Sequence, residues 1–200
     1  MNLQFATYRD FLQNTTTLGA LTAFQTRQLP VGDGTDTKEM RVTVASASYF
    51  SFFNARPALG RFFDAVEDSV PQGAAVVVLG HGFWQSKFGG RTDVIGQTLR
   101  INQQVRTIIG VAPEGFVGMS DQGVPAAWIP LSSYAFEFRG NRYVNNYGWS
   151  WLELVARRKG DISVAAAEAD LKASYYQSWR KESEGSPRAV SPDSARATVV

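Results

Sequence analysis

Hydrophobic and polar positions follow two different periods along this chain. In several short segments they alternate or the hydrophobic positions run together, as in strands with one or two buried faces. Elsewhere hydrophobic positions recur every three or four residues, as in helices packed on a core. Strands are therefore predicted at 18–26, 40–46, 75–79, 99–102, 105–111, 126–131, 151–156 and 196–200. Helices are predicted at 6–14, 48–54, 81–88 and 164–184.

Residues 18–26 fit either a helix or a strand, and we favour a strand because threonines flank them and Pro30 follows. The predicted strands at 99–102 and 105–111 are separated only by a short turn at Gln103 and Gln104, which predicts a β-hairpin. Short strands mixed with helices, without a regular strand–helix alternation, indicate an α+β fold.

The strand at 75–79 leads directly into a helix that contains Trp84. We expect this side chain to be core, with Val77, Leu79 and Ile109 as neighbours. Its truncation to alanine should then cost about 3–5 kcal/mol.

A polar and aromatic segment, 133–148, shows neither period. We expect this segment to be irregular, and we expect Tyr143 and Tyr147 within it and Trp149 directly after it to be at least partly exposed to solvent. Exposed aromatic side chains of this kind commonly contact sugars or protein partners. The alternative is that these rings fold back and cover the core.

Composition limits the classes of function. Of the 200 residues, 44% are hydrophobic and 19% are charged, which predicts a folded chain rather than a disordered one. The net charge of +2 implies neither nucleic acid nor an acidic membrane as a partner. The chain has no cysteine and one histidine, His81, which removes thiolate chemistry and most transition-metal sites.

Two clusters could still carry chemistry. Asp64, Glu67 and Asp68 could hold Ca²⁺, but they lack the spacing of a calcium loop, so we favour a solvated loop. A Gly80-x-Gly82 turn with His81 could suggest a nucleotide loop, or a hydrolase triad with Ser86 and Asp93. The third glycine and the nucleophile motif are both missing, so we favour a structural histidine. We expect no catalytic site, cofactor or metal.

Four long segments together resemble a known family, the periplasmic core domain of MacB-type (FtsX-like) ABC transporter permeases. These are VASASYFSFFNARPALGRFF, AAVVVLGHGFWQSKFGG, DVIGQTLRIN and VRTIIGVAPEGFVG, at 44–63, 74–90, 93–102 and 105–118. Gly80 stands where the family pattern has serine before the histidine, and Lys159-Gly160-Asp161 replaces a Lys-Pro-Gly. Neither departure affects chemistry, because the family's core domain is not catalytic.

The resemblance implies two parts: a porter-like α/β subdomain, residues 1–55 and 141–200, and a small inserted α/β subdomain, residues 56–140. It also implies an extracytoplasmic, periplasmic portion of an inner-membrane permease. One transmembrane helix would precede the segment and three would follow it.

The function that the resemblance implies is non-enzymatic. The domain would couple cytoplasmic ATP hydrolysis to periplasmic conformational change, a process called mechanotransmission. The implied partners are a cytoplasmic ABC ATPase, a second permease copy and a periplasmic adaptor or lipoprotein. The alternative is a periplasmic module that binds a glycan or peptide through the aromatic residues from Tyr143 to Trp151.

Overall fold

The computed structural model describes residues 2–119 and 123–185, which group into two compact units. Unit 1 comprises the described residues of Met1–Ala23 and Arg142–Val200, and unit 2 comprises those of Phe24–Asn141. Both units combine helices with strands, so the predicted α+β fold class is confirmed. The strand predicted at 196–200 lies outside the described residues.

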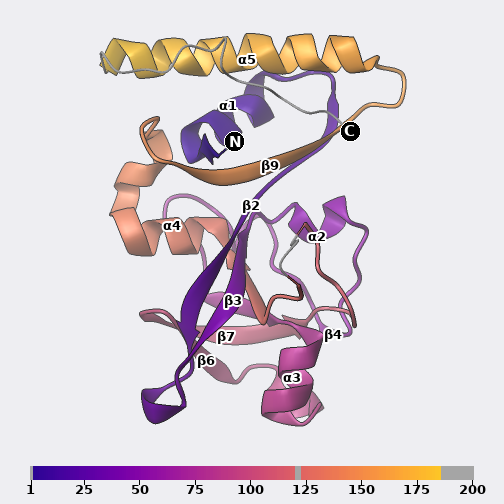
Figure 1. Cartoon of the computed structure of the whole chain (residues 1–200), viewed down its shortest axis with the longest axis vertical. Helices are drawn as coiled ribbons and strands as arrows, with labels where there is room; N and C mark the ends of the chain where they lie inside the picture. The colour runs from indigo at the N-terminus through magenta and orange to yellow at the C-terminus, as the bar shows by residue number, and fades with distance from the viewer. Residues whose placement is uncertain (1, 120–122, 186–200) are drawn as a thin grey trace. The chain divides into compact units, whose positions relative to one another are not determined.

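Unit 1 is a small sheet with two helices stacked on it (Figure 1). Strand β9 (Ser150–Arg158) lies between β1 (Leu3–Gln4) and the first residues of β2 (Leu18–Val31). Helix α1 (Phe5–Asn14) packs against β9, and α5 (Val164–Gly185) packs against α1. Because α1 has a neighbour on two sides, it buries consecutive residues rather than one stripe: Phe5, Ala6, Thr7, Tyr8, Asp10 and Phe11.

Unit 2 is a mixed sheet that begins with the second part of β2. Neighbouring strands follow the order β2, β3, β8, β5, β7, β4, and β6 pairs with β7 as the predicted hairpin. Pairing is parallel between β3 and β8 and between β5 and β7, and antiparallel elsewhere. The strands are β3 (Lys38–Ala45), β4 (Leu59–Gly60), β5 (Val76–Leu79), β6 (Thr98–Ile101), β7 (Gln104–Val111) and β8 (Ala127–Pro130). The helices are α2 (Tyr49–Phe52), α3 (His81–Phe88) and α4 (Leu131–Arg139), and the 3-10 turns are η1 (Gly34–Asp36), η2 (Thr92–Val94) and η3 (Gly140–Asn145).

An aromatic cluster fills the core of unit 2. Trp128 on β8 is fully buried, and its ring lies 5.9 Å from that of Phe50 and 5.4 Å from that of Phe116. Phe62 stacks flat on Phe50 at 3.8 Å. The backbone at Arg61 lies very close to Gly110 of β7. A Cβ on Gly110 would lie 2.1 Å from the carbonyl oxygen of Arg61, so only glycine fits at this position.

Segment 133–148 is not irregular as predicted, because α4 and η3 occupy most of it. The reason lies on the inner face of α4, where Ser132 and Ser133 are buried beside Leu131 and Tyr134. Buried serines satisfied by polar partners do not register as hydrophobic positions, so the helical period is hidden in the sequence.

The prediction that Trp84 is core is also wrong. No residue of α3 is buried, and Trp84 is half-buried, with its indole N–H donating to the carbonyl oxygen of Arg91 at 2.9 Å. The helix is short, and a left-handed Gly89 ends it. Its aromatic side chains therefore contact one another on the surface, as Phe83 and Phe88 do at 6.1 Å between ring centres.

The two tryptophans of unit 2 should respond differently to truncation. Trp84→Ala is expected to lower the free energy of unfolding by only about 1–2 kcal/mol, since it removes one hydrogen bond and a half-buried ring. Trp128→Ala, the matched change at a fully buried site, should cost about 3–5 kcal/mol. Chemical denaturation of both variants measures the difference, and equal losses would contradict this assignment.

The compact units divide the chain differently from the predicted subdomains. Their boundary after Asn141 lies beside the predicted boundary after residue 140, but the first falls after Ala23 rather than after residue 55. Residues 24–55 group with unit 2 because β3 within them pairs in parallel with β8. The assignment of a porter-like and an inserted subdomain stays a prediction.

Candidate functional site

The three aromatic residues predicted to contact a partner occupy different environments in unit 1. Tyr143 is buried, with its ring packed edge to face against Phe5 at 4.8 Å, so the prediction that it is exposed is wrong. Tyr147 and Trp149 are half-buried. Trp149 stacks on the buried Trp151 at 4.7 Å. Packing of aromatic rings on one another therefore accounts for part of the pattern that suggested a binding loop.

Tyr147 belongs to a polar cluster, the Asp10 clamp, formed by Asp10, Tyr147, Ser178 and Lys181. The buried Asp10 on α1 accepts hydrogen bonds from the Tyr147 hydroxyl at 2.9 Å, the Ser178 hydroxyl at 2.7 Å and the Lys181 ammonium at 2.6 Å. Burial alone would raise the pKa of Asp10, but the bonds from Lys181, Ser178 and Tyr147 outweigh it and lower that pKa. The clamp thus joins α1 to the second half of α5 through a charged group.

A second polar contact holds the first half of α5. Asp170 accepts hydrogen bonds from the backbone N–H groups of Thr16 and Thr17 at 2.8 and 2.9 Å, and from the Thr17 hydroxyl at 2.7 Å. Thr16 and Thr17 lie in the turn between α1 and β2. Two carboxylates, one on each helix, therefore fix α5 against α1 and the turn that follows it.

Sequence reasoning missed the Asp10 clamp, although a signal for it is present. Asp10 lies on the same face of α1 as Thr7 and directly precedes the buried Phe11. A carboxylate therefore lies among the buried side chains of this helix. On α5, Ser174, Ser178 and Lys181 follow at intervals of four and three, a polar stripe at helical spacing. Together these features indicate two helices that meet through polar groups.

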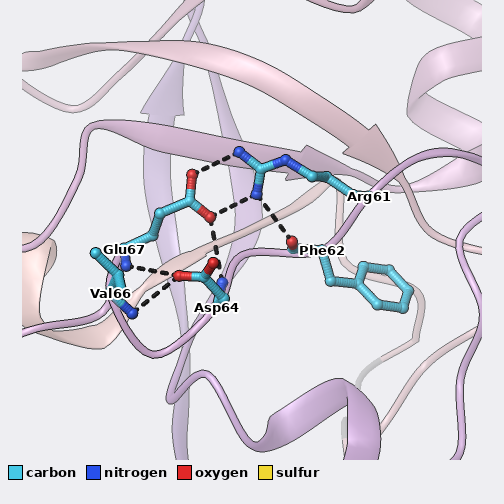
Figure 2. A network of polar contacts seen from close by, with 5 residues as sticks. All are labelled: Arg61, Phe62, Asp64, Val66 and Glu67. Carbon is cyan, nitrogen blue, oxygen red and sulfur yellow. Dashed lines mark hydrogen bonds and ion pairs between the residues drawn. The ribbon is translucent and has the colours of Figure 1, made fainter.

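In unit 2 the acidic residues predicted to form a solvated loop organise the chain instead (Figure 2). Glu67 pairs with Arg61 through both oxygens, at 2.6 and 2.8 Å, and this pairing lowers the pKa of Glu67. Asp64 accepts hydrogen bonds from the backbone N–H groups of Val66 and Glu67, at 2.9 and 3.0 Å. These contacts shape the turn that carries Asp68.

Asp68 departs furthest from the predicted solvated loop. Its carboxylate accepts hydrogen bonds from the Ser132 backbone N–H at 2.9 Å, the Ser132 hydroxyl at 2.8 Å and the Ala47 N–H at 3.0 Å. Ser132 lies in the first turn of α4, so Asp68 caps that helix from a distant loop. Burial raises the pKa of Asp68 to about 6, and the hydrogen bonds from Ser132 and Ala47 oppose this shift.

A buried ion pair supports the other side of α4. Arg106 on β7 has no exposed surface, and it donates to the Ser133 hydroxyl at 2.8 Å and to Glu137 at 3.2 Å. Glu137 also accepts from the Asn102 amide and the Gln103 N–H in the hairpin turn, at 2.8 and 3.0 Å. Burial lowers the pKa of Arg106 to about 10.

The residues considered for catalysis are not brought together. Ser86 donates to the carbonyl oxygen of Phe83 in its own helix, and Asp93 pairs with Arg91. His81 is half-buried and its ring lies 5.3 Å from that of Trp84. Within residues 2–119 and 123–185, no three His, Cys, Asp or Glu side chains gather in a way that could hold a metal ion. In the same residues, no helix has the length and apolar character needed to cross a membrane.

Solved structures share this arrangement of elements. The periplasmic region of MacB from Actinobacillus actinomycetemcomitans is 18% identical, with a TM-score of 0.65 over 88% of this chain and 74% of the other. A domain of a putative permease from Porphyromonas gingivalis is 16% identical, with a TM-score of 0.65 over 88% and 71%. The extracellular domain of the noncanonical ABC-type transporter YknZ from Gram-positive bacteria is 12% identical, with a TM-score of 0.58 over 90% and 85%.

Comparison at the level of sequence gives two results. No curated protein matches the chain. Residues 6–174 match the family described as the MacB-like periplasmic core domain, which covers elements of both compact units. The family is one of extracytoplasmic domains of transporter permeases. The resemblance first noted in four sequence segments is therefore confirmed, and this chain belongs to the family of MacB-like periplasmic core domains.

Proposed function

We propose that this chain is a non-enzymatic domain that couples ATP hydrolysis in the cytoplasm to conformational change outside the membrane. The observation that carries the proposal is the family match over residues 6–174. The parent protein is then an ABC transporter permease in an inner membrane. Its proposed partners are a cytoplasmic ABC ATPase, a second permease copy and an extracytoplasmic adaptor or lipoprotein.

The packing of unit 1 supports this proposal. A domain that transmits movement needs a rigid connection between the segments that receive it. Helix α1 is the first helix of the described chain and α5 is the last, and the Asp10 clamp and Asp170 hold them together. A membrane helix preceding α1 and another following α5 would then displace unit 1 as one body.

The proposed partner contact involves the aromatic residues near the start of β9. Tyr143 is buried and Tyr147 is bonded to Asp10, whereas Trp149 is half-buried and stacks on Trp151. We propose partner contact at Trp149, with Tyr147 two residues before it. A glycan- or peptide-binding module that uses all three rings is less well supported, because each ring also has a packing or hydrogen-bonding role.

The test is the effect of the Asp10 clamp on coupling in the full-length permease assembled with its ATPase. Asp10→Asn removes the negative charge that holds Lys181 but keeps the size of the side chain. We expect ATP hydrolysis to continue at its basal rate while transport falls at least about tenfold, since the two helices can then move separately. Lys181→Arg, which keeps the ion pair, should leave transport unchanged.

Thermal melting of the 200-residue chain separates coupling from folding. Asp10→Asn should remain folded at the temperature of the transport assay. Full transport by a folded Asp10→Asn permease would contradict the proposal that the clamp transmits movement. An ATPase activity of the chain itself would contradict the proposal that it is non-enzymatic.

A further inference from the structure

A groove in unit 2 is lined by helix α3 and by the hairpin that β2 and β3 form. Its volume is about 470 Å³, within the range of sites that bind small molecules. The hairpin contributes polar and charged side chains, and the helix contributes a half-buried aromatic ring. The lining includes Gln28, Glu39 and Arg41 of the hairpin and Gly82, Phe83 and Ser86 of α3.

Backbone contacts fix the start of α3 against β3. The Gly80 N–H donates to the Ala126 carbonyl oxygen at 2.7 Å, and the Ala126 N–H donates to the Arg41 carbonyl oxygen at 2.8 Å. A Cβ on Gly80 would lie 2.2 Å from the carbonyl oxygen of Pro125, so this close approach requires glycine. Pro125 and Ala126 themselves line the groove. Its lining is therefore held in place by the fold.

The other glycine of the Gly80-x-Gly82 turn leaves space in the groove. A Cβ on Gly82 would meet no atom of the described residues within 4 Å. The two glycines that suggested a nucleotide loop in the sequence thus act differently: Gly80 lets two backbone segments meet, and Gly82 leaves its part of the lining without a side chain.

Two opposite charges line the hairpin side of the groove. Glu39 and Arg41 are two residues apart on β3, so their side chains leave the same face of the strand about 7 Å apart. Gln28 of β2 is paired with Arg41 and lies on that face as well. Glu39 and Arg41 both belong to the described part of the chain, and no ion pair joins them. The groove thus presents a carboxylate and a guanidinium as separate contacts.

These groups define the chemistry of a ligand. A simple cation would be repelled by Arg41 and a simple anion by Glu39, so the matching ligand carries one charge of each sign. Phe83 adds an apolar contact from the side of α3. The ligand that fits is a small zwitterion with an apolar side chain.

We propose that this groove binds a dipeptide with apolar side chains, with its ammonium group at Glu39 and its carboxylate at Arg41. Length selects the dipeptide, because two extended residues span about 7 Å, the same as the spacing of Glu39 and Arg41 along β3. A single amino acid spans about 3.5 Å and a tripeptide about 10 Å. This inference goes beyond the proposed function and does not depend on it, because it concerns a site in unit 2 that can be tested in the isolated chain.

The experiment titrates the ¹⁵N-labelled 200-residue chain with L-leucyl-L-leucine. We expect saturable amide shifts at Glu39, Arg41 and Gly82. N-acetyl-leucyl-leucine and leucyl-leucine amide each lack one charge and should bind about tenfold more weakly. Leucine and trileucine, with the wrong length, and glycylglycine, without apolar side chains, should also bind at least about tenfold more weakly. Equal binding of any of these five compounds would overturn the proposal.

Variants of the two charged residues assign each end of the ligand. Glu39→Gln should weaken the binding of leucyl-leucine about tenfold but leave that of the acetylated peptide unchanged, since the acetylated peptide has no ammonium group. Arg41→Gln should weaken leucyl-leucine to the same extent and leave the amide unchanged. Arg56→Gln, which removes an exposed charge outside the groove, should change none of these affinities.

Filling the groove provides an independent test. Gly82→Leu places a side chain where a Cβ has space, and leucine favours a helix more than glycine does, so the variant should melt no lower than the wild type. It should not bind leucyl-leucine. Saturable binding by a folded Gly82→Leu chain would overturn the proposal, as would shifts confined to residues outside the groove or no saturable binding by the wild type.

Discussion

Replacing Glu137 by alanine is expected to lower the free energy of unfolding by about 3–5 kcal/mol. The change leaves the fully buried Arg106 without its counter-charge, and breaking a buried pair from one side costs this much because the remaining charge stays desolvated. It also removes the acceptor for Asn102 and for the Gln103 N–H in the β6–β7 turn. Urea denaturation of the 200-residue chain measures the loss.

Two variants serve as controls for this result. Glu137→Gln keeps an acceptor for the hairpin turn but not the charge, so its loss should lie between those of the wild type and Glu137→Ala. Asp36→Ala removes the partner of Lys87 in an exposed ion pair and should not change the unfolding midpoint measurably. If Glu137→Ala were as stable as Asp36→Ala, the Arg106–Glu137 pair would not support the packing of α4 on the sheet.

Asp68 should make the folded chain less stable as the pH rises from about 4 to 6. Burial raises the pKa of Asp68 from 3.8 to about 6, so the folded chain holds this proton more tightly than the unfolded chain does. The favourable contribution is complete below about pH 3 and is lost above about pH 6. A shift of about two pKa units corresponds to about 3 kcal/mol.

Comparison with Asp68→Asn isolates this contribution from those of the other carboxylates. The variant carries no titrating group at this position, so the difference in free energy of unfolding between wild type and variant should change by about 2.4 kcal/mol between pH 4 and pH 7. The wild type should lose stability relative to the variant across this range. A constant difference would show that Asp68 titrates alike in the folded and unfolded chain.

The local spacing of hydrophobic residues is sufficient to predict the helices and strands whose buried residues are apolar. Alternation predicted the β6–β7 hairpin and β9. The strand favoured at 18–26 is confirmed, but Pro30 does not end it, because β2 continues through Pro30 to Val31. Helix α4 was missed because its buried positions include Ser132 and Ser133, which are satisfied by Asp68 and by Arg106. Those partners are 64 and 27 residues away in sequence, and no local pattern contains them.

The candidate site was harder to predict for a similar reason. The aromatic residues of 143–149 were expected to face a partner, but Tyr143 packs on Phe5 and Tyr147 bonds to Asp10, both at the other end of the chain. Whether an aromatic side chain in a polar segment is exposed depends on which residues distant in sequence pack against it. The sequence does indicate a polar stripe on α5, which could have been matched to the buried Asp10 on α1.

The coupling function can be tested most directly by measuring the distance between two ectodomains in the assembled transporter. The chain contains no cysteine, so a single Gln177→Cys on the exposed side of α5 gives one spin-label site per permease copy in a parent protein otherwise free of cysteine. We expect ATP, bound to a hydrolysis-deficient ATPase, to shift the distance distribution between the two labels. The Asp10→Asn variant should reduce this shift. Identical distributions with and without bound ATP would contradict the proposal that the domain transmits movement across the membrane.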